Sequence, residues 1–399
     1  MSKKSVSKKK VLTIAGLGWM FDAMDVGMLS FIIAALKTDW GLSAEQMGWI
    51  GSINSIGMAV GAFVFGLWAD RIGRKNIFII TLVMFSLASG LSAFTTTLTL
   101  FLILRFFVGM GLGGELPVAS TLVSEIVPAH DRGRIVVLLE SFWAVGWLIA
   151  AVISYFVIPS FGWQVALLLS ALPAFYAIYL RINLPDSPAF SPNKAEKRKV
   201  MQNIREVWSK PYARSTFVLW TLWFTVVFSY YGMFLWLPSV MVMKGFSMIQ
   251  SFEYVLIMTL AQLPGYFTAA WFIERIGRKF VLVTYLLGTA ASAFVFGNAE
   301  TTTLLMVSGI LLSFFNLGAW GALYAYSPEQ YPSVIRGTGT GMAASVGRVG
   351  GILGPLLVGS LVTAGYSIGF IFSIFCGSIL IGVLAVAMLG QETRQLELT

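Results

Sequence analysis

Long apolar stretches separated by short polar ones occupy most of this chain. A helix needs about 20 apolar residues to cross the hydrocarbon core of a bilayer, and twelve segments of this kind can be marked. They cover about 11–36, 45–69, 76–94, 99–123, 134–158, 163–183, 214–238, 251–273, 280–298, 302–324, 337–362 and 367–389. The pattern predicts an all-α membrane protein with twelve transmembrane helices.

One ten-residue motif also occurs twice in the chain. Residues 66–75 (GLWADRIGRK) return as residues 270–279 (AWFIERIGRK), an offset of 204 positions (270 minus 66). Glu125, Pro128, Arg132 and Gly133 return with the same offset as Glu329, Pro332, Arg336 and Gly337. Two separate motifs that share one offset indicate a duplicated half. We therefore expect two pseudo-symmetric six-helix bundles over 1–183 and 214–399, joined by a polar linker over 184–213, with substrate bound between the bundles.

The placement of charge sets the orientation and excludes several classes of protein. Charged residues make up only 11% of the 399 residues, although the net charge is +9. The cations gather at the N-terminus and in every second loop, whereas the other loops hold only Lys37 and Lys244. This pattern predicts a cell-membrane protein with both termini in the cytoplasm, and it leaves no basic face for nucleic acid. The single histidine, His130, lies in a loop, and the sequence has neither a nucleophile–His pair nor a cluster of metal ligands. We therefore expect neither an enzyme nor a bound metal or cofactor.

Several motifs point to one family. The GxxxDRxGRK phrase, its copy and the Arg-Gly pairs after the fourth and tenth segments resemble the major facilitator superfamily over essentially the whole chain. FDAMD at 21–25, RFFVGMGLGGELP at 105–117 and GRVGGILGP at 347–355 resemble proton-coupled aromatic-acid symporters. The runs LLESFWAVGWLIAAVISYFVIPSFGW and FSYYGMFLWLPSVM look like bacterial niacin permeases. The resemblance implies alternating access around a central cavity and proton-driven import of niacin, as nicotinate or nicotinamide.

Ionisable residues within the apolar segments are the first candidates for chemistry, because each costs about 2.5–3.5 kcal/mol at the bilayer centre. Asp22 and Asp25 lie three residues apart on one helical face, and either could carry a coupled proton. The alternative is a structural role, either capping a break near Gly18 or Gly27 or pairing with an internal arginine. Arg348 stays charged and needs an anion, which Asp22, Asp25 or a substrate carboxylate would supply. Arg105 is a further candidate, either for proton coupling or for holding the helices together. Glu115, beside Pro117, is also a candidate for proton coupling, and we expect it to line a cavity or a gate unless its role is structural.

Aromatic side chains at mid-depth are candidates for stacking on a flat ligand, with ordinary core packing as the alternative. With Arg348, the candidate substrate-binding residues are Trp143, Tyr230, Tyr231, Trp320, Tyr324 and Asn316. For the amides Asn316 and Gln262, hydrogen bonds between helices are the alternative role. By resemblance, Asp70, Arg74, Glu274 and Arg278 stabilise one gate. For Glu140 we expect a gate ion pair with a loop arginine.

Other functions stay open at this point. The same fold could import another small aromatic monocarboxylate or export multiple drugs, although the intramembrane Arg348 disfavours the second. PDSPAF at 185–190, where sugar porters have PESPRW, argues against a sugar substrate. A receptor without transport activity is disfavoured by the acids at mid-membrane. The expected partners are nicotinate, protons and the lipid bilayer, with the protein acting as a monomer.

Overall fold

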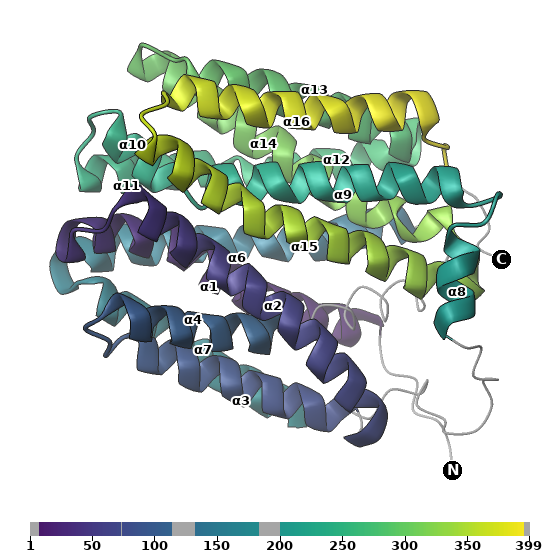
Figure 1. Cartoon of the computed structure of the whole chain (residues 1–399), viewed down its shortest axis with the longest axis horizontal. Coiled ribbons are helices and arrows are strands. Elements are labelled where there is room, and N and C mark those ends of the chain that lie inside the picture. Colours follow the sequence, from purple (N-terminus) through teal and green to yellow (C-terminus); the bar gives the residue numbers. More distant parts are fainter. Residues whose placement is uncertain (1–7, 73, 114–131, 183–199, 395–399) are drawn as a thin grey trace.

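The computed structural model of the chain describes residues 8–72, 74–113, 132–182 and 200–394 (Figure 1). The regular elements in these ranges are all helices. The first half contains α1 (Lys8–Trp40), α2 (Ala44–Ile72), α3 (Arg74–Ser92), α4 (Leu98–Gly113), α6 (Arg132–Phe161) and α7 (Trp163–Ile182), and α8 (Val200–Val207) follows. The second half contains α9 (Ala213–Phe234), α10 (Leu237–Met243), α11 (Met248–Leu260), α12 (Gln262–Ile276), α13 (Arg278–Gly297), α14 (Thr302–Tyr326), the 3-10 turn η1 (Pro328–Gln330), α15 (Ser333–Thr363) and α16 (Ile368–Leu389).

These helices occupy the twelve predicted spans. Within the described ranges, nine spans are long and apolar enough to cross a bilayer, and three shorter apolar helices lie at the remaining predicted places. The prediction of an all-helical membrane protein is therefore confirmed. Two segments differ in detail, since α11 and α12 share the span predicted over 251–273, and α10 follows α9 at the end of 214–238. Pro238 and Pro264 stand in the first turns of α10 and α12, where a missing backbone N–H is tolerated.

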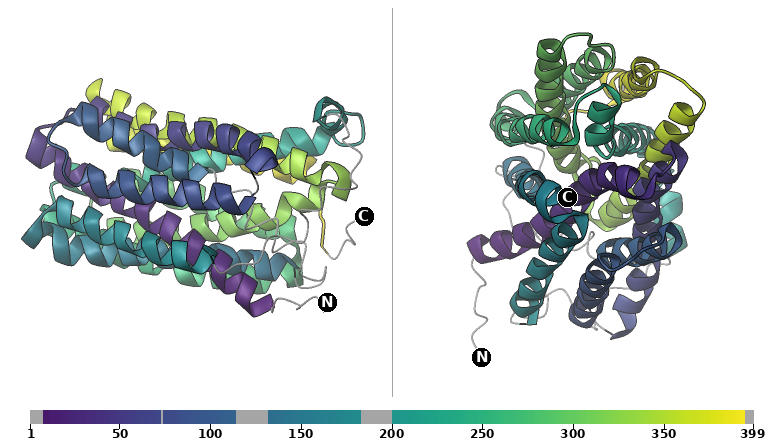
Figure 2. Two further views of the ribbon diagram at one scale, coloured as in Figure 1. Left: turned by 90° about the horizontal axis from the view of Figure 1, so that it is seen from below. Right: turned by 90° about the vertical axis from the view of Figure 1, so that its left-hand side faces the viewer.

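The helices lie side by side in two groups (Figure 1). The helices of the first half pack on one another, as do α9 to α16, and the groups meet where α2 contacts α15 and where α6 contacts α11, α12 and α14. The start of α1, the end of α16 and α8 lie at one end of the bundle, here called the terminal end (Figure 2). The opposite end is called the far end.

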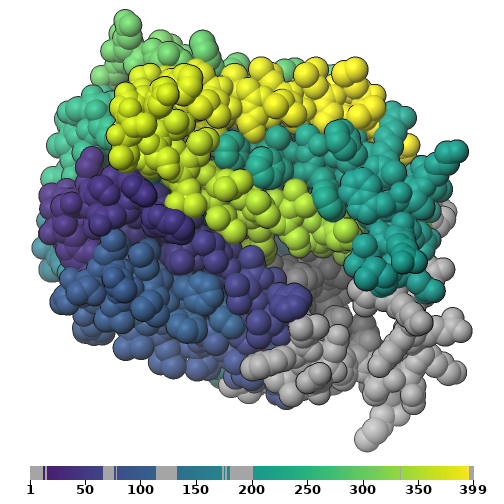
Figure 3. Space-filling model, viewed as in Figure 1, coloured from purple at the N-terminus to yellow at the C-terminus, as the bar shows by residue number. Residues whose placement is uncertain are grey.

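Direct contacts join the two groups on both sides of the middle. Toward the far end, the Ser52 hydroxyl donates a 2.6 Å hydrogen bond to the carbonyl of Ile352, and α2 and α15 lie together along the surface (Figure 3). At the terminal end, the backbone N–H of Arg134 donates a 3.1 Å hydrogen bond to Oε1 of Glu274. The two groups of helices therefore touch both toward the far end and at the terminal end.

The outer surface of the bundle is apolar. Phe63, Phe156 and Met388, on three different helices, are 70%, 64% and 72% exposed. A soluble protein rarely exposes apolar side chains over so wide an area, so this surface fits the hydrocarbon core of a bilayer.

Glycines set the separation of α2 and α4. A Cβ atom at Gly109 would collide with the carbonyl oxygen of Asn54, and one at Gly113 would collide with that of Met58. The helices can therefore pack backbone to backbone only because these positions lack side chains.

Gly109→Ala is therefore expected to destabilise the protein by about 1–3 kcal/mol, the usual range for overpacking a tight contact. The measurement is the thermal midpoint of the purified protein in detergent. Gly90→Ala on α3 is the matched control, because a Cβ atom there meets nothing within 4 Å. Equal midpoints for the two variants would contradict this account of the α2–α4 contact.

Candidate functional site

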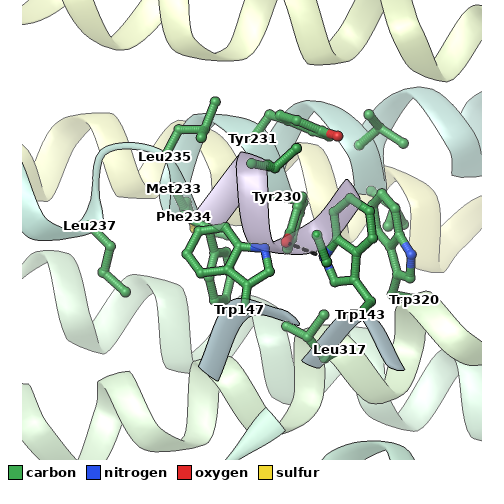
Figure 4. Packing of buried hydrophobic residues seen from close by; sticks show 14 of the residues in the cluster. Trp143, Trp147, Tyr230, Tyr231, Met233, Phe234, Leu235, Leu237, Leu317 and Trp320 are labelled. Carbon is green, nitrogen blue, oxygen red and sulfur yellow. Dashed lines mark hydrogen bonds between the residues drawn. The ribbon is translucent and has the colours of Figure 1, made fainter. Parts of the chain in front are cut away.

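Tryptophan and tyrosine rings from both groups of helices meet in the middle of the bundle (Figure 4). The central aromatic cluster, as we call it, consists of Trp19 of α1, Trp143 and Trp147 of α6, Tyr230 and Tyr231 of α9, and Trp320 and Tyr324 of α14. All except Tyr324 are buried. Trp and Tyr normally gather at the membrane surface, so their position between the two groups of helices suggests a role beyond anchoring.

Three of these rings pack across the boundary between the groups. Nε1 of Trp143 donates a 2.7 Å hydrogen bond to the Tyr230 hydroxyl (Figure 4). The Trp320 ring lies 4.7 Å from the Tyr230 ring and 6.3 Å from the Trp143 ring, to which it is nearly parallel at 23°. These separations lie within the range of attractive aromatic contacts. The cluster therefore presents flat apolar faces together with polar hydroxyl and indole groups.

Arg348 of α15 lies beside this cluster. Its side chain is half-buried and within electrostatic range of the hydroxyls of Tyr231 and Tyr324. Its guanidinium makes no hydrogen bond or ion pair with the parts of the chain that the structure describes. A guanidinium remains charged, and its fork of N–H groups matches a carboxylate. This position therefore suits an anionic ligand.

Asp25 is paired with a different arginine. Its two carboxylate oxygens accept hydrogen bonds of 3.1 and 2.6 Å from Nη1 and Nη2 of Arg105, and both side chains are at most 1% exposed. The sequence offered Asp22, Asp25 or a substrate carboxylate as the anion for Arg348. Because Asp25 pairs with Arg105, it is not the partner of Arg348. The bidentate pair ties α1 to α4 inside the first half.

Asp22 lies one helical turn before Asp25 and is also buried. It is within electrostatic range of Tyr231, which is likewise within range of Arg348. Tyr231 is therefore a common neighbour of an acid on α1 and a base on α15, across the boundary between the two groups.

Glu140 lies in the cluster, away from the loops. Its Oε2 accepts a 2.9 Å hydrogen bond from Nε1 of Trp19, and the Trp320 indole approaches the same carboxylate without completing a hydrogen bond. The expected ion pair with a loop arginine is not found within the described ranges. The reason is depth, because Glu140 stands eight residues after Arg132, the first residue of α6, which is about 12 Å along a helix.

Two amide side chains have no hydrogen-bond partner among the residues that the structure describes. Both polar atoms of Gln262 on α12 and of Asn316 on α14 are buried and unpaired there, so the hydrogen bonds between helices considered for them are not found in the described part of the chain. The hydroxyl of Tyr266, four residues after Gln262, is also unpaired.

In the second copy of the repeated motif, at 270–279, the structure gives the partners of Arg278. Arg278 Nη1 donates a 2.7 Å hydrogen bond to Glu274, and its Nε donates a 3.0 Å hydrogen bond to Glu329. The side chains of Asp70 and Arg74 and the whole of Glu115 lie outside the described residues.

Sequence reasoning did not select Trp19, Trp147 or Tyr266 for the site. The signal that selected Trp143, an aromatic residue at mid-depth in a span, applies to all three. No group of three or more His, Cys, Asp and Glu side chains suited to a metal ion is found in the part of the chain that the structure describes.

The comparisons with known proteins agree with this fold. The profile of the Major Facilitator Superfamily matches residues 15–263 and 254–397. The chain is 67% identical to the putative niacin/nicotinamide transporter NiaP of Bacillus subtilis over 99% of both proteins. It is 48% identical to the niacin transporter NiaP of Acinetobacter baylyi over 96% of this chain and 94% of that protein. These relatives are named as transporters and not as enzymes.

Solved structures show the same architecture. The proton:xylose symporter XylE bound to 6-bromo-6-deoxy-D-glucose superposes with a TM-score of 0.78 at 20% identity, over 98% of this chain and 97% of that chain. A partially occluded, inward-open structure of XylE from E. coli gives a TM-score of 0.80 at 20% identity, over 98% and 99%. At this identity the likeness concerns the fold alone. Together with the family profile and the two close relatives, it shows that the chain belongs to the Major Facilitator Superfamily.

Proposed function

We propose that this chain is a proton-coupled importer of niacin that works by alternating access between its two halves. The names of the relatives at 67% and 48% identity support niacin as the substrate. The observation that carries the proposal is Arg348, a guanidinium without an acidic partner in the described chain, beside a cluster of aromatic rings.

Nicotinate fits these two features. It is flat, so it can stack on the rings of Trp143, Trp320 and Tyr230, and it carries one carboxylate, which Arg348 can bind through two parallel hydrogen bonds. Tyr231 and Tyr324, the neighbours of Arg348, supply hydroxyl groups for the same carboxylate. Because these residues come from α6, α9, α14 and α15, a bound ligand would contact both halves.

Proton coupling in this proposal depends on the acids of α1. A proton on Asp22 removes a negative charge that competes with the substrate for the field of Arg348. A proton on Asp25 weakens the ion pair with Arg105 and so loosens the contact between α1 and α4. A site that takes up one proton and one monocarboxylate gains no net charge, which lowers the cost of moving it through a medium of low dielectric constant. Glu115 remains a further candidate for this step.

The repeated loops act as the gate at the terminal end, which this proposal places in the cytoplasm. Glu274 links the halves through the backbone of Arg134, and Arg278 holds Glu274 in place. The bond from Arg134 must break when the halves, 1–183 and 214–399, separate at this end. Asp70 and Arg74 have the corresponding place in the first copy.

The purified protein in proteoliposomes is expected to accumulate labelled nicotinate against its gradient when the outside is acidic. A protonophore should abolish accumulation, and unlabelled nicotinate should compete. Folded protein that shows no uptake of nicotinate would overturn the substrate. Uptake that equilibrates nicotinate without responding to the proton gradient would overturn the coupling.

A further inference from the structure

The strongest unexplained feature of the interior is the pair of amides on α12 and α14. Gln262 is fully buried and Asn316 is 1% exposed, yet both polar atoms of each side chain lack a hydrogen-bond partner within the described ranges. A buried polar atom without a partner costs about 1–3 kcal/mol. Four such atoms on two neighbouring helices therefore carry a substantial energetic cost.

The two amides lie near the point where α12 and α14 cross. A Cβ atom at Gly265 would collide with the carbonyl of Phe314, so α12 and α14 touch at this point. Gln262 stands three residues before Gly265, and Asn316 stands two residues after Phe314. Both amides therefore lie within one helical turn of the same crossing.

The amides share faces with residues of the central cluster. Asn316 lies four residues before Trp320, and Gln262 lies four residues before Tyr266, so each pair occupies one side of its helix. The Trp320 ring contacts Tyr230, and the Tyr266 hydroxyl is within electrostatic range of Glu140 and Tyr230. The two amides thus border the place where the aromatic rings meet.

We propose that Gln262 and Asn316 form the subsite that recognises the ring nitrogen of a pyridine carboxylate. This inference rests on the proposed function. A pyridine nitrogen only accepts hydrogen bonds, whereas an amide NH₂ donates them. One amide donates to the ring nitrogen, and the second amide completes the network by accepting from the first. Arg348 is left for the carboxylate at the other side of the ring.

The proposal predicts discrimination against benzoate, which has the same carboxylate and ring size but no ring nitrogen. A site built to hydrogen-bond a polar group rejects the analogue that lacks it, because its own buried groups stay unpaired. For a neutral hydrogen bond we expect wild-type protein to favour nicotinate over benzoate by on the order of 100-fold in competition for nicotinate uptake.

The test compares wild-type protein with Asn316→Leu and Gln262→Met, which keep side-chain size and remove hydrogen bonding. In each variant, the concentration of nicotinate that half-saturates uptake should rise by about 10-fold or more, while inhibition by benzoate stays the same or strengthens. Asn54→Leu is the matched control. Asn54 is buried with an unpaired Oδ1, but it lies between α2 and α4 in the first half, so its variant should keep the preference of wild type.

The outcomes separate this inference from the proposed function. If wild-type protein takes up no nicotinate, the proposed function fails. If it takes up nicotinate but benzoate competes equally well, the amide subsite is overturned with no variant needed. If both variants fold and keep the wild-type preference, the amides do not read the ring nitrogen and the inference is likewise overturned.

Discussion

Arg348→Met is expected to abolish accumulation of nicotinate in proteoliposomes. In the proposed function, the guanidinium of Arg348 binds the substrate carboxylate beside the central aromatic cluster, because Asp25 is already paired with Arg105. A charged, bidentate hydrogen bond contributes about 1.5–3 kcal/mol, which corresponds to a loss of about 10- to 150-fold in affinity. Because no other cation is described beside the cluster, the desolvation of the substrate carboxylate would also go uncompensated, and uptake should fall below detection.

Lysine at this position provides a graded test. Arg348→Lys keeps the charge and loses the planar fork, so weak uptake with a raised half-saturating concentration is expected. Arg205→Met serves as the control, because Arg205 is exposed on α8 and far from the aromatic cluster. Initial rates of labelled nicotinate uptake at several concentrations distinguish the three variants. Wild-type uptake by folded Arg348→Met protein would show that Arg348 is not part of the binding site.

The fold was open to prediction because the bilayer imposes a simple rule on sequence. Each span must be a helix of about 20 apolar residues, so hydropathy alone marked the segments that became helices. The repeat over 66–75 and 270–279 added the prediction of two halves. The break at Ala261 was missed, because α11 and α12 together still have the length and hydropathy of one span.

The partners of the buried charges were harder to predict. Spacing placed Asp22 and Asp25 on one face of α1, but it could not show which helix that face meets. The pairing of Asp25 with Arg105 depends on the packing of α1 and α4 inside the first half, which leaves no local signal in the sequence. Glu140 shows the same limit, because its partner Trp19 is 121 positions away in the chain.

The aromatic residues were easier to predict than the partners of the buried charges, but harder than the helices. Their position at mid-depth could be predicted from their place within apolar spans, and this was enough to select Trp143, Tyr230 and Trp320. The hydrogen bond from Trp143 to Tyr230 links residues 87 positions apart, so it required the arrangement of the two halves. Sequence thus suggested candidate aromatic side chains, and tertiary packing decided which of their rings meet.

The second large effect is expected when the ion pair between Asp25 and Arg105 is broken. Asp25→Asn leaves the guanidinium of Arg105 buried without a counter-charge, and breaking a buried pair in this way costs about 3–5 kcal/mol. We therefore expect a strongly lowered thermal midpoint and little folded protein. Replacing both partners, as in Asp25→Asn with Arg105→Met, removes both charges and should restore much of the stability.

The double variant separates a structural pair from a coupling pair. If Asp25 takes part in proton coupling, folded double-variant protein should exchange labelled for unlabelled nicotinate across the membrane, because Arg348 and the aromatic rings are intact. It should not accumulate nicotinate when an inward proton gradient is applied. Accumulation at the wild-type level, abolished by a protonophore, would instead show that the pair only holds α1 to α4, and it would leave Asp22 and Glu115 as the candidates for the acid that carries the proton.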